Sequence, residues 1–130
     1  MYKLTEICGE TYGAYPACLI DFYLPERDPA ETPLYIHFHG GGLESGSRRD
    51  RYVIELAEKY GIAVASADYR MYPAAKFPEF IEDAAAACAY AVKKTEGKYK
   101  TVIVGGSSAG AYLSMMLYFA PQYLAAAGLR

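Results

Sequence analysis

The chain has 130 residues, 53% of them hydrophobic and 22% charged, a composition typical of one globular domain and not of a disordered segment. Thirteen basic and fifteen acidic side chains give a net charge of −2, which argues against the basic face of a nucleic-acid-binding protein. The longest apolar stretch, near residues 84–92, is too short to cross a membrane, so we expect neither nucleic acid nor a membrane as a partner.

The first part of the chain predicts two short strands, over residues 2–12 and 17–24, joined by a turn. A polar surface loop follows at residues 25–29. Residues 34–39 form a near-continuous apolar and aromatic run, which is typical of a strand covered on both faces of a parallel sheet. This strand leads into three consecutive glycines, residues 40–42, called here the triple-glycine loop.

Beyond the triple-glycine loop, helical and extended patterns alternate. We predict helices over residues 49–60, from Pro78 to about Gly97, and from Ser108 to Pro121. Strands are predicted over residues 62–67 and 101–104. The alternation predicts a parallel sheet with helices on its faces, entered by an antiparallel strand pair. The expected fold class is therefore α/β, a three-layer α/β/α sandwich.

Each predicted helix has an apolar stripe that we expect to face the sheet. The three stripes are Tyr52, Val53, Leu56, Ala57 and Tyr60 in the first helix, Phe80, Ile81, Ala84, Ala85, Cys88 and Val92 in the second, and Ala111, Tyr112, Met115, Met116 and Phe119 in the third.

The cysteines indicate a reducing compartment. Cys8, Cys18 and Cys88 are an odd number and lack metal-ligand spacing, so free thiols are the simplest interpretation. The first residues lack the apolar core of a signal peptide. We therefore expect a cytoplasmic protein without a bound metal.

Ser108 carries the strongest chemical signal in the chain. It is the central residue of Gly106-x-Ser108-x-Gly110, between a predicted strand and a predicted helix. A serine on such a sharp turn has a strained backbone, and a Cβ at either flanking glycine would clash with the neighbouring elements. The helix N-terminus provides free N–H groups and a positive dipole next to developing negative charge. Ser108 is therefore a candidate nucleophile.

Rival interpretations of the same glycines can be tested on the sequence. A dinucleotide fingerprint, Gly-x-Gly-x-x-Gly counted from Gly105, fails because its third residue, which must be glycine, is Ser107. A phosphate-binding loop fails because Ala111 and Tyr112 follow the last glycine in place of Lys and Ser or Thr. The remaining alternative is an ordinary tight turn in which Ser107 or Ser108 caps the helix.

The triple-glycine loop supports the nucleophile interpretation. Its backbone N–H groups can approach a substrate oxygen closely because no side chains intervene. Each such donor stabilises the transition state of acyl transfer by about 3 kcal/mol. Three glycines alone are more often a flexible turn. A glycine loop followed later in the chain by a serine on a sharp strand-to-helix turn is, however, a recognised pair of motifs.

These motifs resemble those of the α/β-hydrolases, specifically the hormone-sensitive-lipase-like branch of esterases. The matching segments occur in the family's order and cover most of the chain from about residue 17: residues 37–42, 68–70 with Pro73, Phe77 and Pro78 with Asp83, and residues 106–110. Ser107 stands where this branch usually carries Asp.

The resemblance implies roles for particular residues. It implies Ser108 as the nucleophile and an oxyanion hole formed by the N–H groups of Gly41, Gly42 and Ala109. His39 and Gly40 would support the loop, while residues 68–70 and Asp83 would hold structural positions. No cofactor is implied.

The residues that would activate Ser108 are missing from their usual place. In this fold the triad acid and histidine follow the serine, but no His, Asp or Glu follows Ser108 here. His37 and His39 lie two apart on one strand and so point to one face. We interpret them as buried or loop-supporting histidines and not as the catalytic base.

The other charged candidates are also interpreted as structural or solvated. We interpret three acidic residues as surface or turn residues: Asp21, Asp28 and Asp50. Three arginines suit a solvated helix start better than a site for an anionic substrate: Arg48, Arg49 and Arg51.

The sequence therefore predicts a serine carboxylester hydrolase of small acyl esters. We expect residues 1–130 to be the N-terminal part of a single α/β-hydrolase domain, a truncated fold without the triad acid and histidine, inactive or nearly so alone. The alternatives are a non-catalytic small-molecule-binding protein of this fold and a peptidase or formamidase relative. The strand at residues 101–104 would be an exposed apolar edge, through which we expect self-association.

Overall fold

The computed structural model describes residues 1–44 and 46–129. Its strands are β1 (Leu4–Thr11), β2 (Leu19–Pro25), β3 (Leu34–Phe38), β4 (Ala63–Ala67) and β5 (Val102–Gly106). Its helices are α1 (Arg51–Tyr60), α2 (Glu79–Lys94), α3 (Ala109–Phe119) and α4 (Gln122–Ala126), with one 3₁₀ turn, η1 (Pro29–Glu31), that begins at the last residue of the predicted polar loop.

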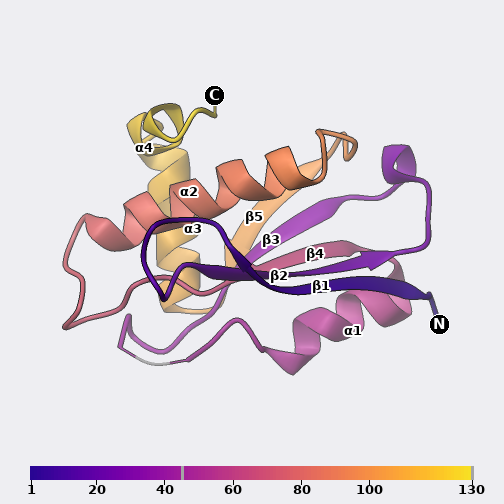
Figure 1. The fold of residues 1–130 in the computed structure, drawn as a ribbon, viewed down its shortest axis with the longest axis horizontal. Coiled ribbons are helices and arrows are strands. Elements are labelled where there is room, and N and C mark those ends of the chain that lie inside the picture. Colours follow the sequence, from indigo (N-terminus) through magenta and orange to yellow (C-terminus); the bar gives the residue numbers. More distant parts are fainter. Residues whose placement is uncertain (45, 130) are drawn as a thin grey trace.

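The five strands form one mixed sheet in the order β1-β2-β4-β3-β5 (Figure 1). β1 and β2 are antiparallel, β2 runs antiparallel to β4, and β3 is parallel to both β4 and β5. This arrangement confirms the predicted α/β class with an antiparallel entry pair. β3 lies between β4 and β5, so its C-terminal end, where the triple-glycine loop begins, lies next to the C-terminal end of β5.

Helices cover both faces of the sheet (Figure 1). On one face α1 packs through Val53 and Ala57 against Tyr23 and Val64. On the other face α2 and α3 pack against a larger apolar cluster that includes Ile36 and Phe38 of β3. The alternation of side chains along β3 thus divides the core into two layers and gives the predicted three-layer sandwich.

The helix ends follow local chemistry. α1 stops at Gly61, which takes the left-handed conformation at φ 67° that glycine adopts without strain. α3 ends before Pro121, as predicted, but the chain then forms the additional short helix α4, because a proline φ near −64° is compatible with a helix start. Among the described residues, the helices are too short or too polar to cross a membrane.

The predicted inward stripe of α3 is wrong for three of its five residues, while Met116 packs against the larger apolar cluster as predicted. Gly110, Leu113 and Leu117 are the buried residues of α3. Three residues predicted to be inward are exposed: Tyr112 at 39%, Met115 at 57% and Phe119 at 72%. The reason is that β5 is an edge strand, so the described part of the chain covers only one side of α3, and an all-round apolar helix gives no periodic signal for which side that is.

The stripe of α1 is partly wrong for a simpler reason. Val53 and Ala57 are buried as predicted, but Tyr52 and Tyr60 lie at the border of the stripe and remain 49% and 66% exposed. The stripe of α2 is confirmed over Phe80, Ile81, Ala84, Ala85 and Cys88, all of which are buried.

Candidate active site

Ser108 occupies a sharp turn between β5 and α3. Its backbone has φ 50° and ψ −109°, a conformation that residues with a side chain rarely adopt, and the residue is exposed. The flanking glycines are required by close packing: a Cβ on Gly106 would lie 2.7 Å from the carbonyl carbon of Gly110, and a Cβ on Gly110 would lie 2.5 Å from that of Phe38. The turn therefore holds the Ser108 hydroxyl at the surface, at the N-terminus of α3.

The triple-glycine loop lies against this turn. A Cβ on Gly40 would lie 3.0 Å from the carbonyl oxygen of Ser107 and 3.6 Å from Cβ of Ser108. Gly41 and Gly42 both have positive φ, at 120° and 66°, which lets the loop fold back over the C-terminal end of β3. The backbone of Gly40 therefore packs directly against the turn that carries the candidate nucleophile.

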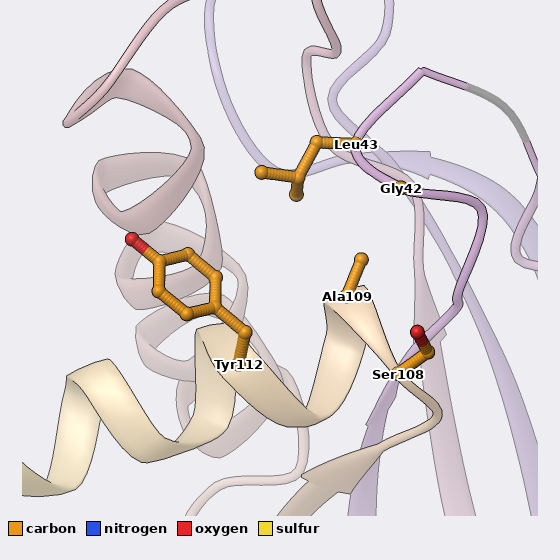
Figure 2. A pocket seen from close by; sticks show the side chains of 5 residues that line it. All are labelled: Gly42, Leu43, Ser108, Ala109 and Tyr112. Carbon is orange, nitrogen blue, oxygen red and sulfur yellow. The ribbon is translucent and has the colours of Figure 1, made fainter.

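Ser108 opens onto a cavity of about 420 Å³ (Figure 2). Its lining residues are Gly42, Leu43, Ser108, Ala109 and Tyr112. Three of the predicted site residues, Ser108, Gly42 and Ala109, thus surround one space, while Gly40 packs against the neighbouring turn. Gly41 connects the two within the loop.

His39 is buried at the base of the triple-glycine loop, 1% exposed. Its Nδ1 lies 2.7 Å from the carbonyl oxygen of Gly40, so that nitrogen carries the proton and donates. The ring stacks on Tyr69 at 4.5 Å, and the Tyr69 hydroxyl donates to the His39 carbonyl at 2.8 Å. Its Nε2 has no hydrogen-bond partner in the described structure and lies 3.9 Å from Asp68 Oδ1. These contacts tie His39 to the loop backbone and to Tyr69.

His37 is fully buried on the α1 side of β3. Its Nε2 lies 2.7 Å from Asp50 Oδ2, and its Nδ1 lies 2.9 Å from the Tyr35 hydroxyl. Both ring nitrogens are therefore occupied by partners other than Ser108. Asp50 stands at the N-cap position of α1 and joins that helix to β3 through this contact.

The buried imidazole of His37 predicts a pH dependence of stability. Burial lowers the pKa of His37, and the hydrogen bond to Asp50 offsets this only in part. Below the ordinary value of 6.5 the unfolded chain binds the proton more readily than the folded chain, so the free energy of unfolding falls as the pH drops through that range.

A His37→Gln variant is expected to show a shallower fall, measured by urea unfolding between about pH 5 and pH 8. Equal slopes in the two proteins would contradict the assignment to His37.

Arg48 forms ion pairs with two carboxylates, those of Asp21 and Asp68. Arg48 Nε lies 2.8 Å from Asp21 Oδ1, and Arg48 Nη1 lies 2.6 Å from Asp68 Oδ2. The backbone N–H of Arg48 also donates to Asp68 Oδ1 at 2.7 Å. Burial alone would lower the pKa of Arg48, but the bonds to the two carboxylates outweigh it and raise that pKa.

This cluster corrects two predictions. Asp21 is only 1% exposed, so its interpretation as a surface or turn residue is wrong, and Arg48 is an ion-pair partner and not part of a solvated helix start. Asp21 is the one charged residue in the apolar strand Leu19–Pro25, and that was the available signal for a buried ion pair. Asp28 and Arg51 are exposed, as predicted.

Three further contacts fix the surroundings of the site. Arg70 forms a bidentate ion pair with Asp83 of α2 and stacks on the ring of Tyr15 at 3.7 Å. The Tyr52 hydroxyl lies 2.8 Å from Ser107 Oγ and so links α1 to the turn. The Tyr52–Ser107 contact was not predicted, because the position of Tyr52 on the apolar stripe of its helix indicated a core residue.

Comparisons with known proteins identify the family and the fold of the chain. The family model BD-FAE matches residues 20–122. Human hormone-sensitive lipase is 32% identical over 94 residues, which cover 68% of this chain and 9% of that protein. The mouse hormone-sensitive lipase is 31% identical over the same length, which is 12% of that protein.

Solved structures of esterases share the fold. A bacterial heroin esterase is 29% identical with a TM-score of 0.75, and the match covers 92% of this chain and 39% of that one. The esterase LipW from Mycobacterium marinum is 28% identical with a TM-score of 0.73, covering 91% of this chain and 38% of that one. The chain therefore spans about a tenth of the length of the two lipases and about two fifths of the two esterases.

Proposed function

The chain belongs to the BD-FAE family, within the hormone-sensitive-lipase-like α/β-hydrolases, and from that premise we propose that it carries the nucleophile and oxyanion hole of a serine esterase for small acyl esters. The observation that carries the proposal is the common cavity shared by Ser108, Gly42 and Ala109. The strained, exposed turn at Ser108 supports it.

In the proposed reaction, Ser108 Oγ forms a bond to the ester carbonyl carbon and gives up its proton to a base. The ester C–O bond then breaks, and the alcohol leaves with a proton. The N–H groups of Gly41, Gly42 and Ala109 bind the negative oxygen of the tetrahedral intermediate, where a single donor is worth about 3 kcal/mol. Water releases the acid from the acylated serine by the same steps, and no cofactor is required.

Neither histidine of the chain is placed to act as that base. His37 is held by Asp50 and Tyr35, and His39 is held by Gly40 and Tyr69. We propose that a histidine and an acid outside this sequence, in the same or another polypeptide, act on Ser108. Without the histidine a complete serine enzyme loses roughly a millionfold in kcat.

Hydrolysis of p-nitrophenyl acetate tests this proposal. The purified 130-residue chain is expected to turn over below about 10⁻³ s⁻¹, since typical esterase turnover is reduced by the missing base. The Ser108→Ala variant is the control for background hydrolysis. A rate above about 1 s⁻¹ that disappears in Ser108→Ala would contradict the proposal that the base lies outside this sequence.

A second candidate function is the binding of a small molecule without turnover. The engagement of both histidines in other contacts favours it. The test requires this chain together with the proposed histidine and acid. An ester that binds to that assembly and is recovered intact would support this candidate over the esterase. A panel of matched amide and ester substrates would separate a peptidase or formamidase from an esterase.

The free thiols support the proposed cytoplasmic location. Cys8, Cys18 and Cys88 are all unpaired in the structure. Burial raises the pKa of the Cys88 thiol to about 12, so this group stays protonated and unreactive at neutral pH.

We further propose that copies of the chain associate through the outer edge of β5. Val102 and Ile103 in that strand are 42% and 49% exposed, and β3 is the only described strand that pairs with β5. Residues 101–129 contain no charged side chain, so the edge lacks the charges that usually prevent strand pairing.

An Ile103→Lys variant is therefore expected to shift the chain towards the monomer in sedimentation velocity. Tyr60→Lys is the matched control, because Tyr60 is also an exposed apolar residue but lies on α1. If the two variants have the same distribution of species, β5 is not the contact.

A further inference from the structure

The cavity beside Ser108 has two large side-chain walls that the proposed reaction does not use. Leu43, the residue after the triple-glycine loop, and Tyr112 of α3 line the space next to Ala109, with Ser108 at one end (Figure 2). The remaining lining residues are small, and no lining residue is charged.

Tyr112 is placed by the helix that starts at the nucleophile. It lies four residues after Ser108, and its backbone N–H donates to the Ser108 carbonyl at 3.0 Å. Residues four apart share one face of a helix, so the ring stands one turn above the serine. Tyr118 lies on the same helix but is 79% exposed and does not line this cavity.

Leu43 is placed by an unusual backbone. Its φ of 65° belongs to the left-handed region that favours glycine, and a β-carbon there is unfavourable. The Leu43 carbonyl accepts a hydrogen bond from the Tyr72 N–H at 2.7 Å, which ties this conformation to a second loop. A turn alone would be served better by glycine. The Leu43 side chain instead packs on one side against the larger apolar cluster and lines the cavity on the other.

We propose that Leu43 and Tyr112 are the specificity-determining walls of a subsite for one uncharged, branched or short alkyl group of the ester. The proposal rests on the proposed function in one respect, that the ester carbonyl lies at Ser108. The cavity, of about 420 Å³, is shallow and widely open to solvent, so it suits contact with one short group and not the enclosure of a large ligand. A charged group between a leucine and a tyrosine ring would lose hydration without gaining a partner.

Two esters of nearly equal shape test the subsite. Methyl 4-methylpentanoate ends in an isopropyl group, whereas monomethyl succinate ends in a carboxylate of similar size. Binding is measured by titrating each into the ¹⁵N-labelled 130-residue chain carrying Ser108→Ala, following the backbone amides of Gly42, Ala109 and residue 112 by NMR. Because that variant lacks the nucleophile hydroxyl, the readout does not depend on catalysis.

The dissociation constant obtained from the chemical shifts of these amides is expected to be at least about tenfold lower for the neutral ester than for the charged ester. Adding Tyr112→Ala or Leu43→Gly is expected to weaken binding of the neutral ester by about three- to tenfold. Tyr112→Phe keeps the aromatic ring and is expected to keep the affinity. Tyr118→Ala, the matched control on α3, is expected to change it less than about twofold.

Equal affinities for the two esters, equal effects of Tyr112→Ala and Tyr118→Ala, or no shift of these amides would each overturn the subsite. Failure of the esterase proposal has a different signature. In that case the neutral ester still binds between Leu43 and Tyr112, but the chain with Ser108 intact is never acylated on that residue.

Discussion

The Gly110→Ala variant is expected to lose about 4 kcal/mol or more of its free energy of unfolding, and to lack a cooperative unfolding transition if the parent stability is modest. Gly110 is buried in the first turn of α3, where that helix meets β3. An added Cβ would overlap the Phe38 carbonyl oxygen, lie 2.5 Å from the Phe38 carbonyl carbon and 2.9 Å from the His39 carbonyl oxygen. These are backbone atoms at the C-terminal end of β3 and of the residue after it, and they cannot move away as a flexible side chain could.

Helix propensity predicts the opposite sign for the same change. Alanine in a helix is about 1 kcal/mol more favourable than glycine, so a stabilised variant would show that α3 does not press against β3 as described. Urea unfolding followed by circular dichroism measures the difference. Gly13→Ala is the control, because its Cβ would meet only Cys18 side-chain atoms at 3.4 Å, an ordinary contact, and we expect a change within about 1 kcal/mol.

Replacing Arg48 by methionine is expected to cost about 3–5 kcal/mol of stability at neutral pH. Methionine retains much of the arginine stem but leaves the buried carboxylate of Asp21 and that of Asp68 without their cationic partner. Asp21 would keep hydrogen bonds from the Gly9 N–H and, at 3.4 Å, from the Tyr23 hydroxyl, which do not neutralise its charge. Urea unfolding again supplies the measurement.

A second substitution tests whether the uncompensated charge causes the loss. The Arg48→Met/Asp21→Asn double variant is expected to recover at least about 1 kcal/mol relative to Arg48→Met, because one of the two unpaired charges is gone. Arg51→Met is the exposed control, since that side chain is 73% exposed and its contact with Glu58 spans 3.6 Å. If the double variant is the less stable of the two, the ion-pair explanation fails.

Local patterns were sufficient to predict the elements around the site. The buried run of residues 34–38, the small residues of 63–67 and the turn at Gly106–Gly110 each carry a signal within a few positions, and the structure has a strand or turn at each. Alternation of these elements also predicted the mixed sheet. The order of the strands depends on pairings between distant segments, which local patterns do not contain. The exposed edge at β5 was predicted only from the resemblance, in which further strands follow the serine turn.

The errors arose where distant segments meet. Asp21 and Arg48 are 27 residues apart, and nothing near either one indicates the other. Tyr112 was assigned to the core because an apolar helix offers no periodic contrast, yet the structure places it beside Ser108. His37 and His39 were interpreted correctly as buried, but their partners Asp50 and Tyr69 come from separate elements.

Acetylation of Ser108 by p-nitrophenyl acetate tests the central claim most directly, because Ser107 beside it is an exposed serine without the elbow geometry. Peptide mass mapping at successive times gives the acetylation rate of each serine in the same molecule. If amides of the triple-glycine loop and Ala109 stabilise attack by Ser108, that serine is acetylated at least about tenfold faster than Ser107, and the adduct persists because no base promotes its hydrolysis. Equal rates at the two serines, or faster reaction at Ser107, would contradict the account.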